Sequence, residues 1–152
     1  MEILKHPNKI LKQVSEPLKV PLSNEDKTLL NEMFNYVKEN SDKAVGISAV
    51  QIGVLKRMCA IRFTQNGKTI TYKLVNPKII AHSSKKMYHR EGCLSVEGEY
   101  EQAVGRWESV KVAAYDMITN KNIIINAIGH ESIILQHEID HMDGKLFIDY
   151  LD

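Results

Sequence analysis

The stretch Gln136-His137-Glu138-Ile139-Asp140-His141 decides how the rest of this sequence is interpreted. It belongs to a segment from about His130 to Met142 that predicts a helix ending just before a glycine. His137 and His141 are four residues apart, so on a helix both imidazoles project from one face and can bind one metal ion. Glu138 can then reach a water on that metal without being a ligand, as in zinc hydrolases. Without a third ligand, the same pattern also fits an ordinary charged amphipathic helix.

The two cysteines, Cys59 and Cys93, are the candidates of most interest for a third ligand. Cys59 lies in the apolar run Met58-Cys59-Ala60-Ile61, where a cysteine is most simply a small core residue. Cys93 follows a polar stretch and a glycine, which lets the backbone approach a ligand closely. A thiolate at Cys93 would complete a Cys-His-His site, although spacing alone does not prove this.

Length and composition indicate one ordinary globular domain spanning residues 1–152. The chain is 43% hydrophobic and 26% charged, with a formal charge of +1. This near-neutral balance argues against a protein held on nucleic acid by phosphate contacts. No segment predicts a secretory signal or a membrane span, so we expect a cytoplasmic protein with reduced thiols and no membrane partner.

The remaining segments predict an α+β fold. An extended arm over residues 1–22 is followed by a helix with Ser23 or Asn24 as its cap, whose apolar pattern fades at Asn40-Ser41. Strands are predicted at 57–63 and 69–75 around the turn Asn66-Gly67, and at 110–115 and 122–126. Because the strands precede a late helix rather than alternate with helices, we expect an α+β arrangement rather than an alternating α/β one.

Three segments together resemble the peptide deformylase family. Gly46-Ile47-Ser48-Ala49-Val50-Gln51 is similar to the family's first motif from its second glycine onward. Glu91-Gly92-Cys93-Leu94-Ser95 matches the second motif, and the stretch from Gln136 to His141 matches the third. The resemblance implies an α+β fold in which antiparallel or mixed sheets pack around the third-motif helix, which carries His137 and His141. It also implies hydrolysis of the formyl group from N-terminal formyl-methionine of nascent bacterial peptides, with release of formate.

The resemblance also implies the roles at the reaction centre. Cys93, His137 and His141 become ligands of one divalent metal ion, Fe(II) physiologically, with Zn(II), Ni(II) or Co(II) as substitutes. The metal-bound water attacks the formyl carbon, and Glu138 is the general base. The oxyanion is held by two further donors, the side-chain amide of Gln51 and the backbone N–H of Leu94.

Other residues are implied around this centre. The backbone of Val45 and Gly46 pairs with the substrate peptide like an added strand. Three residues orient the ligands or form ordinary salt bridges, two readings that the sequence does not separate: Glu91, Arg106 and Asp140. The methionine side chain is expected to be enclosed by His89, His130, Ile133 and Ile134.

The sequence departs from the family pattern in several places. Ala44 stands where the family usually has its first glycine, and Ser48 stands where it usually has alanine; both are small, so we expect the loop to be kept. His89 and His130 replace residues that are often apolar, which predicts either a polar wall or rings turned outward. Many bacterial members continue into a basic helix that contacts the ribosome. This sequence ends at Asp152, so any transient ribosome contact is expected to use another surface.

Two rival functions remain open. A zinc peptidase could use the same helix, but such enzymes generally complete the site with His, Glu or Asp rather than a thiolate. A non-catalytic or altered-specificity deformylase paralogue could bind peptides or metal alone. Glu138 and Gln51 argue against a purely binding role, because neither is needed to hold an ion.

Overall fold

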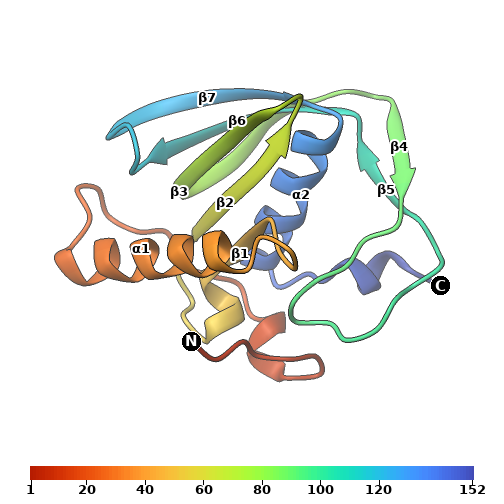
Figure 1. Ribbon diagram of the computed structural model, residues 1–152, viewed down its shortest axis with the longest axis horizontal. Helices are drawn as coiled ribbons and strands as arrows, with labels where there is room; N and C mark the ends of the chain where they lie inside the picture. Colours follow the sequence, from red (N-terminus) through yellow and green to blue (C-terminus); the bar gives the residue numbers. More distant parts are fainter.

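The protein, described by a computed structural model over residues 1–152, consists of two antiparallel sheets and two helices (Figure 1). The larger sheet has the strand order β1-β2-β3-β6-β7, and the smaller pairs β4 with β5. This confirms the predicted α+β class. The strands are β1 (Gly46–Ser48), β2 (Met58–Gln65), β3 (Lys68–His82), β4 (Lys86–His89), β5 (Val104–Trp107), β6 (Ser109–Asp116) and β7 (Lys121–Ile128). The helices are α1 (Asn24–Glu39) and α2 (His130–Met142), with short 3-10 turns η1 (Lys9–Lys12), η2 (Ala49–Ile52) and η3 (Phe147–Tyr150).

Both predicted helices form with the expected ends. Ser23 caps α1, since its hydroxyl accepts a hydrogen bond of 3.1 Å from the backbone N–H of Asp26. The chain leaves α2 at Asp143 and Gly144, and Gly144 has a φ of 74°. A side chain at Gly144 would also collide with the backbone of Lys12, so glycine is required there. The end of α2 is therefore fixed against η1.

The predicted hairpins also form, but one strand is longer than expected. β2 and β3 pair across the turn at Asn66 and Gly67, and β6 pairs with β7. The prediction that the strand over 69–75 ends at Val75 was wrong, because β3 continues to His82. It passes Pro77, which lacks an N–H, through a register shift between Val75 and Lys78.

The smaller sheet was not predicted. Its strands are four residues each, and their alternation of polar and apolar residues is too short to be distinguished from a loop. The expected extended arm likewise contains the short turn η1. The smaller sheet matters for the site because it carries His89 at the end of β4 and Arg106 in β5.

Two apolar layers enclose the larger sheet. On one face, β2 side chains such as Cys59 and Ile61 pack against α2 residues including Leu135 and Ile139. On the other face, residues of β2 and neighbouring strands pack against α1. Cys59 is fully buried, which confirms its prediction as a core residue. As Figure 1 shows, α2 lies between the larger sheet and the β4–β5 pair.

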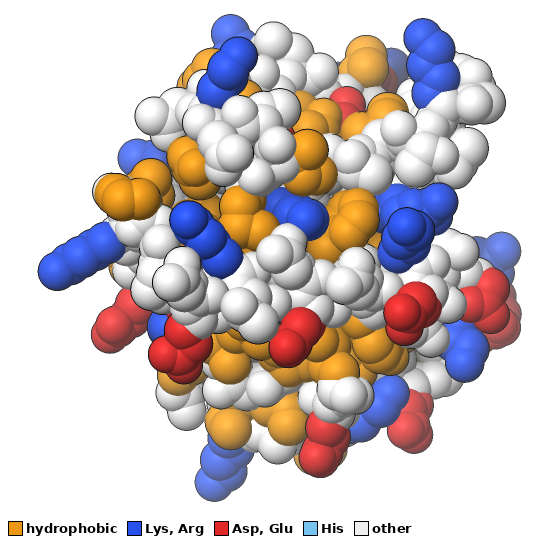
Figure 2. Space-filling model, turned by 60° about the vertical axis from the view of Figure 1, so that its left-hand side comes forward, with side chains coloured by type: hydrophobic (Ala, Val, Ile, Leu, Met, Phe, Trp, Pro, Cys, Tyr) orange, Lys and Arg blue, Asp and Glu red, His pale blue; other side chains and the backbone are white.

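The surface carries charges of both signs. Figure 2 shows lysine and arginine side chains spread over one face, with acidic side chains in its lower half and hydrophobic ones visible between them. The basic side chains are not gathered into one patch on this face. None of the helices has the length and apolar content that crossing a bilayer requires.

Candidate metal centre

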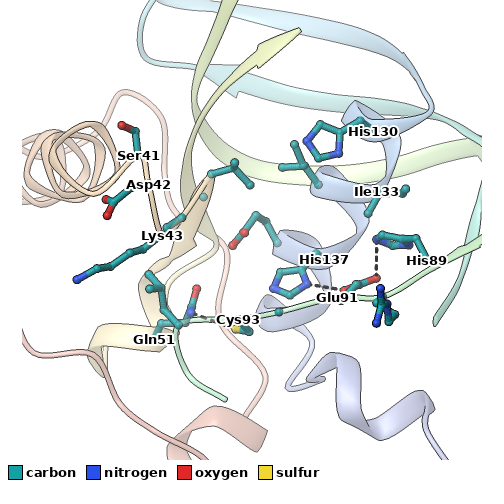
Figure 3. A pocket seen from close by; sticks show the side chains of 18 residues that line it. Ser41, Asp42, Lys43, Gln51, His89, Glu91, Cys93, His130, Ile133 and His137 are labelled. Carbon is teal, nitrogen blue, oxygen red and sulfur yellow. Dashed lines mark hydrogen bonds and ion pairs between the residues drawn. The ribbon is translucent and has the colours of Figure 1, made fainter. Parts of the chain in front are cut away.

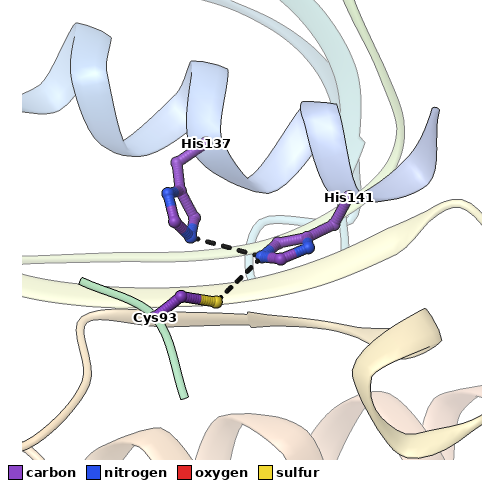
Figure 4. A group of neighbouring side chains, drawn as sticks. All are labelled: Cys93, His137 and His141. Carbon is purple, nitrogen blue, oxygen red and sulfur yellow. Dashed lines mark hydrogen bonds between the residues drawn. The ribbon is translucent and has the colours of Figure 1, made fainter. Parts of the chain in front are cut away.

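Three possible metal ligands converge beneath α2 (Figure 4). His137 and His141 project from the same face of the helix, and their Nε2 atoms are 3.2 Å apart. Cys93 comes from the loop after β4, and its Sγ lies 3.4 Å from Nε2 of His141. Ligand atoms of all three residues lie within 4.8 Å of one another. The predicted Cys-His-His set is therefore brought together.

The spacing and charge preference of this cluster suit a cation. In a tetrahedral site with ordinary metal–ligand bonds, neighbouring ligands lie about 3.3 Å (N to N) or about 3.6 Å (N to S) apart. The distances of 3.2 and 3.4 Å are close to these values. Burial lowers the pKa of His141, leaving a neutral ring able to ligate. Burial would also lower the pKa of His137, but hydrogen bonds to Cys93 and Glu91 outweigh it and raise that pKa. The site therefore favours positive charge.

A chain of ionic contacts holds His137 on the side of its ring that faces away from the cluster. Its Nδ1 bonds Oε1 of Glu91 at 2.7 Å, which leaves Nε2 directed toward the cluster. Arg106 donates two hydrogen bonds of 2.6 and 2.9 Å to Glu91 and one of 2.5 Å to Asp140. Burial alone would raise the pKa of Glu91, but the hydrogen bonds from Arg106 and His137 lower it to about 2. Tyr150 completes the chain by donating to Asp140 at 2.8 Å.

Glu138 lies beside the cluster in a buried position. Its Oε1 accepts a hydrogen bond of 2.9 Å from the hydroxyl of Ser48, and its Oε2 accepts none. Burial raises the pKa of Glu138, although the charge of His137 and the Ser48 bond oppose this shift. Glu138 also fits tightly against β1, since a Cβ at Gly46 would lie 2.7 Å from Oε2. One carboxylate oxygen is thus anchored and the other is left free.

Two donors stand beside Cys93. Gln51 accepts a bond from the backbone N–H of Ser48 at 2.9 Å, which turns its amide nitrogen toward Cys93 Sγ at 3.6 Å and Ser95 Oγ at 3.1 Å. The backbone N–H of Leu94 has no hydrogen-bond partner within the protein. Its carbonyl is held by the ammonium group of Lys5 at 2.6 Å, which steadies the loop.

A cavity of about 460 Å³ opens over this centre (Figure 3). One side is formed by the segment leading into β1, with Val45 and Gly46, and by Gln51. The other side is formed by α2, β4 and the loop after β4. In Figure 3, His130 and Ile133 lie along α2, whereas His89 lies beside Glu91. The predicted wall residues all line this cavity: His89, His130, Ile133 and Ile134.

The family model for polypeptide deformylase matches residues 1–152. The chain belongs to the polypeptide deformylase family. A peptide deformylase from Shouchella clausii is 34% identical to it, over 99% of this chain and 89% of the relative. The crystal structure of a deformylase from Ehrlichia chaffeensis superposes with a TM-score of 0.90 at 31% identity, covering 100% of this chain and 88% of that one. A class I type b deformylase from Acinetobacter baumannii, crystallised with Met-Ala-Ser bound, superposes with a TM-score of 0.87 at 29% identity, covering 99% of this chain and 98% of that one.

Peptide deformylases are metal-dependent hydrolases that remove the N-formyl group from peptides, and this chain is an enzyme of that family. Its Cys93, His137 and His141 cluster is the site that its residues offer for the metal. The sequence left open whether Glu91, Arg106 and Asp140 form salt bridges or orient the ligands. The two roles are compatible, because the ion pairs among these residues also hold His137.

Sequence reasoning missed one residue of the deformylase site. Ser48 was treated only as a small substitute for alanine, yet its hydroxyl bonds the Glu138 carboxylate and its backbone N–H bonds Gln51. Ser48 stands three residues before Gln51, and a serine at that spacing is a signal of a cap at the start of a helical turn, because serine forms hydrogen bonds with groups three residues along the chain. Its bond to Glu138 spans 90 positions and depends on the tertiary fold.

Proposed function

We propose that this deformylase hydrolyses the formyl group from formyl-methionyl peptides newly made in the bacterial cytoplasm, using the groups that meet in the cavity over α2. The observation that carries this proposal is the free Oε2 of Glu138, which faces the same cavity as Cys93 and His137. The Met-Ala-Ser found in the relative from Acinetobacter baumannii is the peptide that such a reaction would leave behind.

Cys93, His137 and His141 would hold the metal, with Fe(II) as the native ion. Bound there, a divalent ion supplies Lewis acidity, lowering the pKa of water and polarising the formyl carbonyl. Thiolate and imidazole donors suit Fe(II) and also Zn(II), Ni(II) and Co(II). The hydrogen bond from Glu91 would keep His137 in the tautomer that presents Nε2.

Glu138 would carry the proton. Oε2 is unpartnered, so it can accept the proton of the attacking water while Ser48 keeps Oε1 in place. Burial raises the pKa of Glu138, which makes the carboxylate a stronger base toward the water proton. The protonated side chain then gives that proton to the departing amine nitrogen. The C–N bond then breaks and releases formate and a free N-terminal amine.

Gln51 and Leu94 would stabilise the negative charge that develops on the formyl oxygen. The amide nitrogen of Gln51 and the unpaired backbone N–H of Leu94 are both donors at the edge of the cluster. Donors placed in advance for an oxyanion typically contribute about 3 kcal/mol each. β1 stands at the edge of its sheet, so Val45 and Gly46 have a free side along which a peptide backbone can lie.

The rival functions have less support. A zinc peptidase generally completes its site with His, Glu or Asp, whereas the third donor beside His137 and His141 is Cys93. A paralogue that only binds peptides would not need the buried, hydrogen-bonded Glu138, because burying a carboxylate is costly when it has no task.

The test is the substitution Glu138→Gln, which keeps an oxygen for Ser48 but removes the base. Formate release from formyl-Met-Ala-Ser should fall by about 10²–10⁴-fold in anaerobic, Fe(II)-loaded protein, with one metal per chain retained. Anaerobic handling protects the thiolate from oxidation.

Glu131→Gln is the matched control on the same helix, because Glu131 contacts Tyr72 and lies outside the cavity lining. It should leave formate release unchanged. Activity of Glu138→Gln within about threefold of the parent enzyme would contradict the assigned role, since general bases contribute far more.

A further inference from the structure

One wall of the catalytic cavity carries two histidines that are not among the metal donors. His130 is the first residue of α2, and His89 is the last of β4. Both line the cavity together with Ile133 and Ile134 (Figure 3). The convergent donor set includes neither of them. Polar rings therefore stand beside the two isoleucines that line this part of the cavity.

These rings make few hydrogen bonds within the protein, and His130 is exposed to solvent. The ring of His130 stands edge-on to Phe63, with centroids 5.7 Å apart, and its nitrogens make no hydrogen bond within the protein. His89 places Nε2 3.5 Å from Glu91, and its Nδ1 is buried with no partner. Burial lowers the pKa of His89, which favours its neutral ring, although the charge of Glu91 opposes this shift. A neutral imidazole offers one N–H donor and one lone pair.

The substrate's first side chain reaches this wall if the proposed function holds, on which this inference rests. A peptide lying along the free edge of β1 has its formyl group beside Cys93 and Glu138. Side chains of an extended peptide alternate in direction. α2 packs against one of the two faces to which these side chains point. We take the first side chain, next to the formyl group, to lie on that face, where His130, Ile133 and Ile134 line the cavity.

We propose that this wall accepts a side chain of methionine length that ends in a polar oxygen, so that formyl-methionine sulfoxide peptides are substrates beside formyl-methionine peptides. The methylene stem packs on Ile133 and Ile134. The sulfoxide oxygen accepts a hydrogen bond from the ring N–H of His130, and His89 keeps the adjoining wall polar. Methionine sulfoxide arises from methionine by oxidation, so the same N-termini can present either side chain.

The chemistry of the reaction is unchanged by this substitution. Water adds to the formyl carbon, the C–N bond breaks, and formate and the free amine leave; the sulfur is neither oxidised nor reduced. What changes is binding. In a wholly apolar pocket the oxygen would lose its water without replacement, a penalty that typically weakens binding by about 10–100-fold. The histidines offset that loss.

The experiment measures the ratio of kcat/KM for formyl-Met-Ala-Ser to that for formyl-Met(sulfoxide)-Ala-Ser, with both peptides competing in one anaerobic reaction. The variants are His130→Leu and His89→Ile, which make the wall apolar. His82→Leu is the control, because His82 stacks on Trp107 outside the cavity. A ratio taken within one sample is independent of how much of the enzyme is folded or metal-loaded.

We expect the parent enzyme to favour methionine by no more than about fivefold, and His130→Leu to raise that preference by about tenfold or more. His89→Ile should raise it too, and His82→Leu should leave it unchanged. If His130→Leu does not fold, the ratio for His89→Ile decides. A parent enzyme that rejects the sulfoxide by 100-fold, or wall variants with the parent's ratio, would overturn the inference. Absence of formate from both peptides would instead contradict the proposed function.

Discussion

Adding one methyl group at Gly46 should disable the general base without removing the metal. The Cβ of Gly46→Ala would lie 2.7 Å from Oε2 of Glu138 and 3.0 Å from its Cδ. Ordinary contact between such atoms needs about 3.4 Å, so the carboxylate would have to move by about 0.7 Å. Its anchor at Ser48 resists that movement. Gly46 has no positive φ, so alanine brings no backbone strain of its own.

The size of the effect follows from that displacement. A misplacement of about 1 Å in a reacting group can cost about 100-fold in rate, so a 0.7 Å shift should lower kcat by about 30–100-fold. This corresponds to about 2–3 kcal/mol of activation free energy. Steady-state formate release would give kcat and KM, and elemental analysis would give the metal content, which should stay at one ion per chain.

Gly105→Ala provides the matched control. Its Cβ would approach Cε1 of Tyr88 at 2.8 Å, nearly the same nominal clash. Tyr88 is 71% exposed, however, and can turn into solvent. This variant should keep the parent's kcat. Parent-like kcat in Gly46→Ala would refute the proposed crowding of Glu138; a raised KM at unchanged kcat would show that the glycine serves the substrate backbone alone.

Two further predictions concern the ligands and their support. Cys93→Ala should lose the bound metal on dialysis, whereas Cys59→Ala should keep it, because Cys59 lies in the core between β2 and α2; metal retained by Cys93→Ala would remove that residue from the ligand set. The pKa of Glu91, lowered from 4.5 to about 2, means that its contacts stabilise the fold fully above about pH 4.5 and lose that effect as the pH falls toward 2. We would measure the free energy of unfolding in urea for the metal-free parent protein and for Glu91→Gln. The parent's advantage should shrink by about 2 kcal/mol between pH 5 and pH 3, at 1.36 kcal/mol per pKa unit. Parallel plots of unfolding free energy against pH for the two proteins would contradict this.

The sequence predicted those parts of the fold that depend on local pattern. Helix α1 has a serine cap and apolar residues at helical spacing, and the β2–β3 turn has an Asn-Gly pair with both φ values positive. The strands of the small sheet carry no such pattern, because they are short and their pairing partner lies 15 to 21 positions away. The bulge that lets β3 continue past Pro77 is likewise a product of pairing with β6.

The residues of the candidate site also fall into those that local pattern predicts and those that depend on the tertiary fold. The spacing of His137 and His141 places them together on any helix, and the structure agrees. Cys93 approaches them only because the loop after β4 is folded beneath α2, so the motif resemblance was needed to select it. The contact of Ser48 with Glu138 required the tertiary structure, since nothing in the sequence near either residue indicates the other.

The three donors of the metal site differ in how they are held, and this bears on metal exchange. His137 and His141 belong to a helix whose side chains fill the core, so freeing them requires much of the protein to unfold. Cys93 lies in an irregular loop secured by single bonds, such as that from Val96 N–H to the Cys93 carbonyl at 3.1 Å. We therefore expect the thiolate to detach first, so that the rate of metal loss is governed by local opening of the loop and not by the stability of the fold.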